Sequence, residues 1–316
     1  MHVVLASQQL LPARGYGGPP RVVVALARGL KALGHRVTVL APPGSRVPEA
    51  TVVPVAPREL GDPRTLETHL PSDAEMVHAH FALARGLASA PFVQTVHRNL
   101  KPGAPPLPNA IFLSRDHARR HGSEVFVYNG LDPAEYFHRR FPKRPEQYDL
   151  FLGKLHRAKG YHWAIEAAKR TGHRLLVAGG WRPSFSGAIQ YVGEVDGATK
   201  AALLARARCL WNPAEWDEPF GLVTIEAFFS GTPVLGTRRG ALPELITPAV
   251  GALCDTMEAM IAASETIHTR SPDACRAHAE RHFTHLVMAA EYVRVYEQVL
   301  ARGVAPPGRP APGAAG

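Results

Sequence analysis

The chain has 316 residues, a formal net charge of +9, 46% hydrophobic residues and 20% charged residues. This length is roughly twice that of a typical domain, so the sequence predicts two packed domains and excludes a minimal module. The 28 glycines and 29 prolines are scattered without a repeat period, which excludes a fibrous chain and favours a soluble globular one.

The features that report on the cellular compartment favour the cytoplasm. The first ten residues, MHVVLASQQL, have neither a basic segment nor a long apolar one, so we predict no signal peptide. No apolar run approaches the roughly 18 residues that span a bilayer. The three cysteines, Cys209, Cys254 and Cys275, lack CxxC spacing and argue against a disulfide framework or a zinc site.

The positive charge is concentrated in the first half of the chain. Residues 1–145 carry a net charge of +8 and residues 146–316 a net charge of +1. No basic run is interleaved with aromatic residues, so nucleic acid is not an expected partner. Two alternatives stay open for the excess charge: an ordinary solvated face, or a surface for an anionic acceptor or a membrane.

Short apolar runs alternate with helical patterns through the first 130 residues. A helix is predicted at 21–33, where apolar residues form a stripe that Gly34 closes. Strands and helices in alternation favour a parallel sheet covered on both faces. The predicted strands lie at residues 3–6, 37–40, 51–55, 74–78, 92–96, 110–113 and 125–128.

The same alternation resumes after residues 133–147, a segment rich in proline and basic residues. From Asp255 onward the pattern is mostly helical, and residues 286–300 form an amphipathic helical pattern. The other predicted helices lie at 161–170, 198–207 and 221–229, and the predicted strands at 148–152, 174–178, 189–192, 209–211 and 233–235.

These elements predict an α/β fold of two doubly wound, parallel-sheet, Rossmann-like domains. We expect the first at residues 1–145 and the second at 146–302. Ligands bind at the carboxyl ends of the strands in such sheets, so we expect a site in a central cleft that the two domains face. The tail at 303–316 is rich in glycine and proline and is predicted to be disordered.

The stretch from Trp211 to Ala227 is the most informative of the sequence. It places Glu218 just before a predicted helix and Glu226 about one and a half turns into it. Two carboxylates at this separation suit the hydroxyl pairs of sugars on either side of a phosphate. Taken alone, the pair also fits ordinary acids that stabilise a helix terminus by about 0.3–1 kcal/mol each.

The full string from Glu218 to Glu226 closely resembles the Glu-x7-Glu motif of retaining glycosyltransferase family 4, whose members have the GT-B fold. Similar segments are spread over most of the sequence from Met1 to about Ile246, so the resemblance implies the whole two-domain fold. In this fold the last helix commonly crosses back to the first domain, so we expect the same of the helix at residues 286–300. The segments that resemble the family are Tyr16–Gly18, Gly34–Val39, Asn129–Asp132, Phe151–Leu155 with Lys159 and Gly160, Gly231–Val234 and Gly240–Glu244.

The resemblance implies roles for the two acids and for two lysines. Glu226 is expected to hold the ribose hydroxyls of a sugar nucleotide. Glu218, with the backbone of Phe220, Gly221 and Leu222, is expected to hold the transferred sugar. Lys154 and Lys159 are expected to stabilise the departing diphosphate, although the family usually has arginine where Lys154 stands, and lysine provides no bidentate fork.

Further site residues follow from the same resemblance. Gly17 and Gly18 precede a helix, where backbone N–H groups can face a diphosphate. His97 ends a strand and is expected against the donor sugar, with Arg98 where the family often has aspartate. Tyr191 and Val192 end another strand, near where the family holds the nucleobase.

Several aromatic and imidazole residues are candidates for other roles. His78 and His80 share one strand face and could bind a metal, but no carboxylate cluster accompanies them, so we expect no metal. Trp181 and Trp216 are candidates for a cleft wall, whereas Trp211 is expected to pack against the core.

The sequence therefore predicts a metal-independent retaining glycosyltransferase that moves a hexose-type sugar from a nucleotide diphosphate sugar to an acceptor hydroxyl. It requires no cofactor beyond this co-substrate, with a UDP- or GDP-sugar expected. The expected acceptor is a small molecule, a glycan or a lipid-linked molecule, with a peripheral membrane contact through the basic first half. The alternative is a GT-B-like protein that binds sugar nucleotides without transfer activity, for which the departures at Lys154, Arg98 and Pro19–Arg21 are the support.

Overall fold

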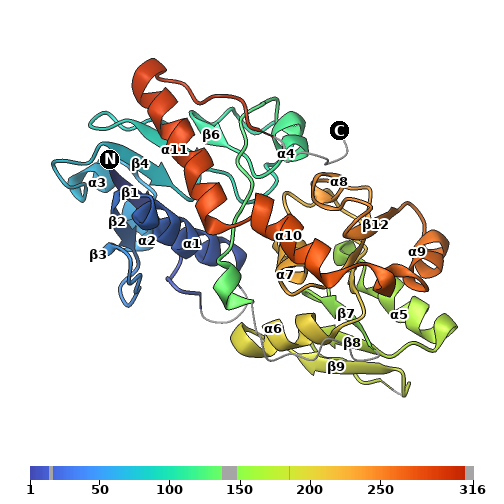
Figure 1. Ribbon diagram of the computed structural model, residues 1–316. Helices are drawn as coiled ribbons and strands as arrows, with labels where there is room; N and C mark the ends of the chain where they lie inside the picture. Colours follow the sequence, from blue (N-terminus) through green and yellow to red (C-terminus); the bar gives the residue numbers. More distant parts are fainter. Residues whose placement is uncertain (14–16, 137–147, 185, 310–316) are drawn as a thin grey trace. The chain divides into compact units, whose positions relative to one another are not determined.

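The computed structural model describes residues 1–13, 17–136, 148–184 and 186–309 (Figure 1). The chain forms two compact units, and one of them is assembled from two separate segments. Unit 1 contains Met1–Leu131 and Phe283–Arg309, and unit 2 contains Asp132–His282. The predicted boundary near residue 145 lies outside the described residues.

Unit 1 is built on a six-stranded sheet in which all neighbouring strands are parallel. Its strand order is β3-β2-β1-β4-β5-β6. All five residues of the first strand, His2–Ala6, are buried, as expected for a strand covered on both faces. The strands are β1 (His2–Ala6), β2 (Arg36–Ala41), β3 (Thr51–Pro54), β4 (Met76–Ala79), β5 (Phe92–Thr95) and β6 (Ala110–Ile111).

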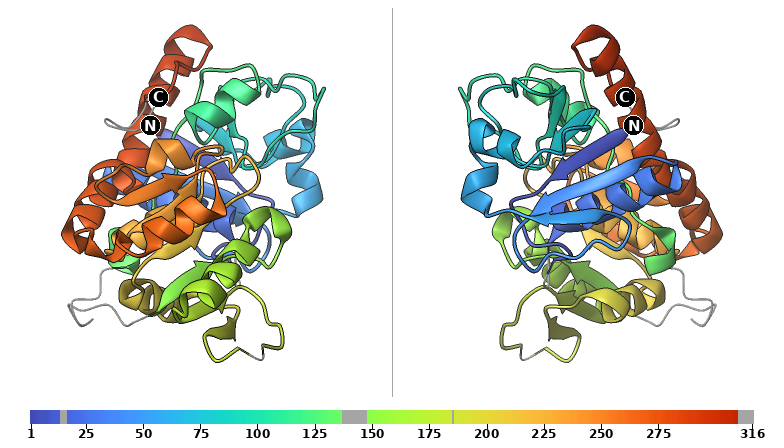
Figure 2. Two further views of the ribbon diagram at one scale, coloured as in Figure 1. Left: turned by 90° about the vertical axis from the view of Figure 1, so that its right-hand side faces the viewer. Right: turned by 90° about the vertical axis from the view of Figure 1, so that its left-hand side faces the viewer.

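Helices cover both faces of this sheet (Figures 1 and 2). On one face α1 (Gly18–Ala32) packs against α11 (His285–Arg302). On the other, Leu60 and Leu66 join a buried apolar cluster with strand residues of β1, β2 and β4. These two leucines belong to the short helices α2 (Pro57–Leu60) and α3 (Pro63–Thr68), and α4 (Arg115–Arg120) follows β6.

Unit 2 repeats the same architecture with a second six-stranded parallel sheet. Its strand order is β12-β11-β10-β7-β8-β9. The strands are β7 (Asp149–Leu152), β8 (Leu175–Ala178), β9 (Ile189–Gly193), β10 (Leu210–Asn212), β11 (Val234–Thr237) and β12 (Gly251–Cys254).

The helices of unit 2 also lie on both faces of its sheet (Figure 2). Residues of α5 and α9 pack in the core cluster of one face, while α7 packs against α10 and α6. The helices are η1 (Pro133–Glu135), η2 (Arg157–Lys159), α5 (Tyr161–Thr171), α6 (Gly197–Arg206), α7 (Leu222–Phe229), α8 (Leu242–Leu245), α9 (Met257–Ser264), η3 (Ile267–Thr269) and α10 (Pro272–His282).

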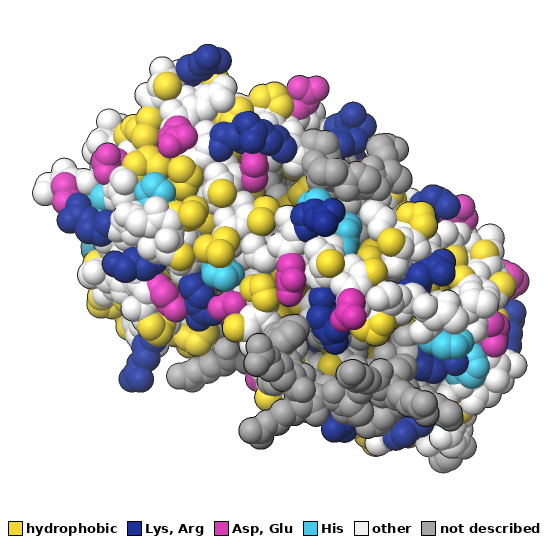
Figure 3. All heavy atoms as spheres, viewed as in Figure 1, with side chains coloured by type: hydrophobic (Ala, Val, Ile, Leu, Met, Phe, Trp, Pro, Cys, Tyr) yellow, Lys and Arg dark blue, Asp and Glu magenta, His cyan; other side chains and the backbone are white. Residues whose placement is uncertain are grey.

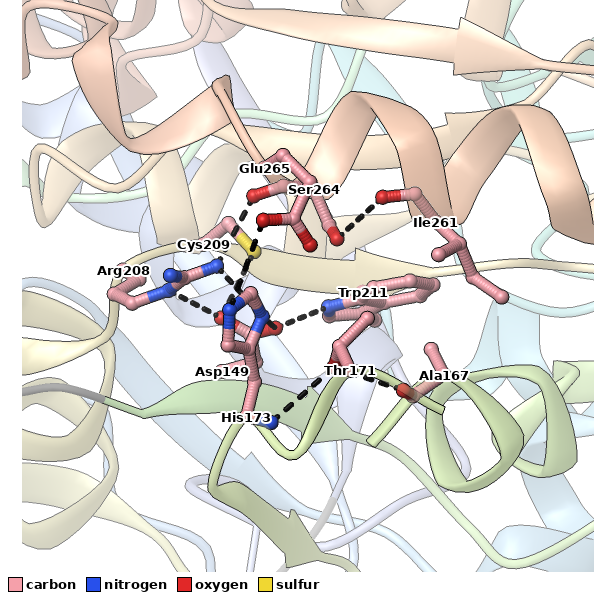
Figure 4. A network of polar contacts seen from close by, with 10 residues as sticks. All are labelled: Asp149, Ala167, Thr171, His173, Arg208, Cys209, Trp211, Ile261, Ser264 and Glu265. Carbon is pink, nitrogen blue, oxygen red and sulfur yellow. Dashed lines mark hydrogen bonds and ion pairs between the residues drawn. The ribbon is translucent and has the colours of Figure 1, made fainter. Parts of the chain in front are cut away.

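A buried polar network stabilises the amino end of the second sheet (Figure 4). The carboxylate of Asp149, at the start of β7, accepts hydrogen bonds from Arg208 Nε at 2.9 Å and from Trp211 Nε1 at 3.1 Å. Trp211 is only 2% exposed, so its expected role in the core is confirmed. The network pairs the buried Asp149 carboxylate with Arg208 and thereby offsets the desolvation penalty that an isolated carboxylate would carry.

The two strand orders define one reversal point in each sheet. Chain connections run outward in opposite directions from β1 and β4 in unit 1, and from β7 and β10 in unit 2. In open parallel sheets, ligands bind outside the carboxyl ends of the strands at such reversal points. The fold therefore directs attention to the segments that follow β1 and β4 in unit 1, and β7 and β10 in unit 2.

The predicted α/β class with two Rossmann-like parallel sheets is confirmed, but one predicted strand is wrong. Residues 125–128 form no strand. Within this segment, only Phe126 pairs with another segment, through an isolated bridge to Phe112, just after the end of β6. Residues 303–309 of the expected tail lie against unit 1, where Gly308 N–H donates to the carbonyl of Glu124 at 2.9 Å. Residues 310–316 lie outside the described residues.

Across the described ranges, every helix is too short or too polar to cross a bilayer.

Candidate functional site

The segments after β7 and β10 bring an acid and a cation together in unit 2. Lys159 Nζ lies 2.5 Å from Glu218 Oε2, and Trp216 Nε1 donates to the same oxygen at 3.1 Å. The ammonium also lies 4.8 Å from the centre of the Trp216 ring. The side chains of Lys159 and Glu218 are 33% and 12% exposed, so both remain in reach of a polar ligand.

Backbone contacts fix the position of this acid. The carbonyl of Glu218 accepts a hydrogen bond from Ala241 N–H at 2.9 Å. A Cβ atom at Gly240 would lie 2.3 Å from the backbone nitrogen of Glu218, and Gly240 has a positive φ of 55°. Only glycine combines this backbone conformation with so close an approach. The Gly240–Ala241 segment therefore holds Glu218 at the carboxyl end of the sheet.

A second set of contacts holds the chain just before Glu218. Glu215 N–H donates to the carbonyl of Ala158 at 2.8 Å. Its carboxylate accepts a hydrogen bond from Trp163 Nε1 at 3.1 Å. Because Ala158 is the immediate neighbour of Lys159, these bonds keep the lysine beside the acid. Two segments that are far apart in the sequence thus form one rigid charged group.

The second acid of the motif has different surroundings. Glu226 lies on α7 and is 2% exposed. Its Oε1 accepts hydrogen bonds from Lys200 Nζ at 2.6 Å and from the Tyr136 hydroxyl at 2.8 Å. Lys200 is itself buried, with a side chain 7% exposed. Glu226 is therefore part of a buried ion pair in this structure, and its ribose contact stays a prediction.

The residues between the two acids form the start of α7. Gly221 is the N-cap residue with a φ of 96°, and Leu222 is the first residue of the helix. The Phe220 side chain is buried, at 2% exposure. The helix is tied to the neighbouring strand β10 by a hydrogen bond of 3.0 Å from Asn212 Nδ2 to Thr224 Oγ1. The predicted backbone contacts to a sugar would come from this fixed segment.

The remaining predicted residues of unit 2 are more peripheral. Lys154 is exposed, and within the described residues its ammonium makes no hydrogen bond or ion pair. Tyr191 and Val192 lie on β9, an edge strand, where both are partly buried. Tyr191 packs against the core cluster, and burial raises the pKa of its hydroxyl. The structure does not bring these three residues into contact with Glu218.

In unit 1, the two glycines follow β1 at the start of α1. Gly17 is the extended N-cap residue and Gly18 the first helical residue, with the family departure Pro19–Pro20 in the first turn. A Cβ at Gly17 would lie 2.8 Å from the Cβ of Ala13. Tyr16 lies outside the described residues. The position after β1 is the one that the reversal point selects, so these glycines stay candidates for a phosphate contact.

His97 follows β5, and its neighbour is His80. From the sequence, His80 was considered only together with His78, as a pair that could bind a metal. His97 Nε2 lies 3.0 Å from His80 Nδ1. Burial, with a smaller contribution from Arg98, lowers the pKa of His97 to about 4. His97 is therefore neutral at pH 7 and can donate or accept one hydrogen bond without adding charge.

No group of three or more His, Cys, Asp or Glu side chains in the described parts of the chain is arranged to hold a metal ion. The pair His78 and His80 stacks with ring centroids 4.2 Å apart. Stacked rings present their faces to each other and do not direct two nitrogens at one ion.

Sequence reasoning missed Lys200, Tyr136 and His80 as partners of predicted site residues. One signal was available for Lys200, because it lies on the same face of α6 as the buried Ala201 and Leu204. A lysine in a buried stripe needs a counter-ion. No such signal exists for Tyr136, which reaches Glu226 only through tertiary packing.

Both halves of this chain are similar to known proteins. Residues 16–146 match the family model described as Glycosyltransferase Family 4, and residues 146–270 match the one described as Glycosyl transferases group 1. A phosphatidyl-myo-inositol mannosyltransferase of Mycobacterium tuberculosis is 27% identical over 360 aligned positions, which cover 91% of this chain and 94% of the relative. A glycogen synthase of the same species is 34% identical over 146 positions, 40% of this chain. The chain spans only 35% of that synthase.

Two solved structures share the fold. AviGT4, a glycosyltransferase involved in avilamycin A biosynthesis, is 29% identical, with a TM-score of 0.81 over 95% of this chain and 98% of AviGT4. Anabaena HepE, solved in complex with UDP and glucose, is 18% identical, with a TM-score of 0.69 over 92% of this chain and 98% of HepE. At that identity, HepE is evidence for the fold alone.

Two Rossmann-like sheets of identical strand order, together with the similarity to AviGT4, define the GT-B fold. The chain belongs to the glycosyltransferases of the family-4 type, since the two family matches together span residues 16–270.

Proposed function

We propose that this protein is a retaining hexosyltransferase. It transfers a sugar from a nucleotide diphosphate sugar to an acceptor hydroxyl without a metal ion. The observation that carries the proposal is the contact between Lys159 and Glu218, 2.5 Å apart, beside the reversal point of the second sheet. Unit 2 is proposed to bind the donor, and unit 1 to recognise the acceptor.

The charges of unit 2 suit a sugar diphosphate. The Glu218 carboxylate accepts hydrogen bonds from sugar hydroxyls, which are donors. The Lys159 ammonium, with the exposed Lys154 as a second cation, stabilises negative charge on the diphosphate as it leaves. Two lysines thereby provide the electrostatic stabilisation that other enzymes obtain from a metal ion, which supports a metal-independent reaction.

The proposed reaction follows the front-side mechanism usually assigned to the family. The acceptor oxygen forms a bond to the anomeric carbon on the face from which the bond to the phosphate oxygen breaks. The acceptor proton passes to that leaving oxygen, so no protein nucleophile is needed. The protein contributes position and charge: Glu218 orients the sugar, and Lys159 balances the phosphate. His97 is proposed to donate a hydrogen bond to a hydroxyl of the same sugar.

The donor and acceptor classes follow from the family and from charge. A UDP- or GDP-sugar is the proposed donor, with support from HepE, which holds UDP and glucose on the same fold. The acceptor is proposed to be a small molecule, a glycan or a lipid-linked molecule. The charge of +8 on residues 1–145 favours an anionic acceptor or contact with a membrane surface. On the face that Figure 3 shows, however, Lys and Arg side chains alternate with Asp and Glu.

The test is a transfer assay with UDP-, GDP- and ADP-sugars against neutral, anionic and vesicle-embedded lipid acceptors, with and without EDTA. We expect turnover that EDTA leaves unchanged, and a product with the anomeric configuration of the donor by NMR. Glu218→Gln is expected to lower kcat/KM by about 10- to 100-fold, the equivalent of one charged hydrogen bond.

Glu258→Gln is the matched control, because Glu258 is an exposed acid of the same unit that pairs only at the surface with Arg170. Its kcat/KM should stay within about twofold of the wild type. Unchanged turnover in Glu218→Gln would refute the assignment of that residue. Binding of a sugar nucleotide without turnover on any acceptor would favour the binding-protein alternative.

A further inference from the structure

The ends of β4 and β5 bring three histidines of unit 1 onto one face of the first sheet. The register pairs His78 with Val93 and Ala79 with Gln94. Side chains alternate along a strand, so His78 and His80 of the first segment and Thr95 and His97 of the second project to the same side. This is the side on which α11 packs, through Tyr292 and Tyr296.

The first of the three histidines is fully anchored. His78 Nδ1 lies 2.7 Å from the Tyr296 hydroxyl, and His78 Nε2 lies 2.7 Å from Thr95 Oγ1. Thr95 Oγ1 is in turn 2.9 Å from the Tyr292 hydroxyl. All four side chains are at most 1% exposed. The His78 ring is therefore a fixed platform, with both nitrogens satisfied.

The second histidine is fixed by stacking on this platform. The His80 ring lies 4.2 Å from the His78 ring, centroid to centroid, with an interplanar angle of 27°. Its Nδ1 is 3.0 Å from His97 Nε2, and the planes of the His80 and His97 rings are nearly parallel, with centroids 5.3 Å apart and an angle of 23°, so these two rings meet edge to edge. The His80 ring that contacts His97 is thus held in place by its packing on the His78 ring.

A single proton is shared by the two facing nitrogens. Burial lowers the pKa of His80 well below its ordinary value and that of His97 to about 4. Both rings are therefore neutral at pH 7, and each carries one N–H. A hydrogen bond between His80 Nδ1 and His97 Nε2 requires that one of these atoms carries its ring's proton and that the other does not.

The buried far side of His80 decides which nitrogen carries the proton. His80 Nε2 is inaccessible to solvent and has no hydrogen-bond partner among the described residues. An orphaned buried N–H is rarer in proteins than an under-satisfied buried acceptor. The lower-cost arrangement therefore leaves Nε2 bare and protonates His80 at Nδ1. That N–H then donates to His97 Nε2, so the His97 proton must be on Nδ1.

We propose that His80 is a positioning residue that fixes His97 as its Nδ1–H tautomer and so makes His97 a hydrogen-bond donor to the substrate through Nδ1. The role of His97 toward substrate rests on the proposed function, whereas the tautomer itself does not. The His80–His97 contact and the unpartnered Nε2 carry the inference.

The direct test is the tautomer of His97 in the full chain, observed by long-range ¹H–¹⁵N correlation at pH 7.5 with ¹⁵N-histidine. His97 is assigned from the signals lost in His97→Gln. We expect protonated Nδ1 and unprotonated Nε2 in the wild type. In His80→Phe, which keeps a flat ring for the stack but has no donor, His97 should shift toward the Nε2–H form. A wild-type His97 protonated at Nε2, or a tautomer that His80→Phe leaves unchanged, overturns the proposal.

Activity supplies the second readout. His80→Phe should lower kcat by about three- to tenfold, the range of one neutral hydrogen bond, with the donor KM unchanged. His80→Asn should restore most of the loss, because its amide N–H can replace the Nδ1 donor. Equal losses in both variants would indicate a merely structural residue. A wild-type chain with the expected tautomer and no transfer on any donor would refute the proposed function and leave the tautomer assignment standing.

Discussion

Glu226 shows how far the surroundings of one side chain can differ from what a motif indicates. The family resemblance assigned Glu226 to the ribose hydroxyls and Glu218 to the transferred sugar. The actual neighbours of Glu226, which are Lys200 and Tyr136, lie 26 and 90 residues away. Spacing within one motif could predict that the two acids share a helix start, but not which cation compensates the buried one. That depends on how α6 packs against α7.

Removing this cation should destabilise unit 2. Lys200→Met keeps most of the side-chain volume and leaves the Glu226 carboxylate buried without its charged partner. We expect a loss of about 3–5 kcal/mol in the free energy of unfolding. Urea titration followed by tryptophan fluorescence measures it, since all four tryptophans, Trp163, Trp181, Trp211 and Trp216, lie in this unit.

Lys169→Met is the control for Lys200→Met, because Lys169 is exposed on α5. Its effect should stay within about 0.5 kcal/mol. A loss below about 1 kcal/mol for Lys200→Met would contradict the prediction. It would mean that water or protonation of Glu226 compensates for the missing ammonium group.

At the scale of elements, apolar runs predicted most strands and long stripes predicted the main helices. The helix predicted at 286–300 is observed as α11, His285–Arg302. β12 was missed because its sequence, GALC, is short and has little β-branched character. The short helices α2, α3, α4 and α8 were missed because four to six residues are too few for a helical period to appear.

The packing of α1 against α11 depends on a glycine inside a helix. A Cβ at Gly29 would lie 2.5 Å from the carbonyl oxygen of His285 and 2.7 Å from the Cβ of Ala289. Gly29→Ala would gain about 1 kcal/mol of helix propensity, but the helices would have to separate. We expect a net destabilisation of about 1–3 kcal/mol, measured by urea unfolding followed by far-UV circular dichroism.

Ala32→Leu serves as the control for Gly29→Ala, since Ala32 is exposed at the end of the same helix. It adds volume where nothing opposes it and should change stability by less than about 0.5 kcal/mol. A Gly29→Ala variant that is more stable than the wild type would show that α1 and α11 leave room for a methyl group at this position.

At the scale of the molecule, length predicted two domains, and the alternation of strands and helices predicted that each contains a parallel sheet covered on both faces. The family resemblance predicted that the last helix crosses back to the first domain, and α11 belongs to unit 1. The apolar stripe of this helix does not by itself indicate which sheet the helix covers.

The two units should also respond differently to acid. Burial lowers the pKa of His78 and of His117, both in unit 1, to about 3, whereas an unfolded histidine titrates near 6.5. Below pH 6.5 the unfolded state binds more protons than the folded state, so stability is lost as the pH falls from 6.5 toward 3. Each of these histidines should contribute a loss of about 2 kcal/mol at pH 5.

Thermal unfolding at pH 7.5 and pH 5 tests this difference. The circular dichroism signal reports both units, while tryptophan fluorescence reports unit 2 alone. We expect an early transition to appear at pH 5 in circular dichroism without a fluorescence counterpart. Between pH 7.5 and 8.5 the histidines stay neutral in both the folded and the unfolded state. The unfolding temperatures measured by the two signals should therefore not change in this range. Coincident transitions at pH 5 would contradict the prediction.

The return of α11 to unit 1 has a consequence for synthesis on the ribosome. Residues 132–282 are translated before α11 exists, so the unit that comes second in the sequence is the first to have all its residues available. Until α11 emerges, the nascent first sheet exposes the face that carries His78 and Thr95. Unit 2 can therefore complete its fold before unit 1, whose first 131 residues lack α11 until the end of translation.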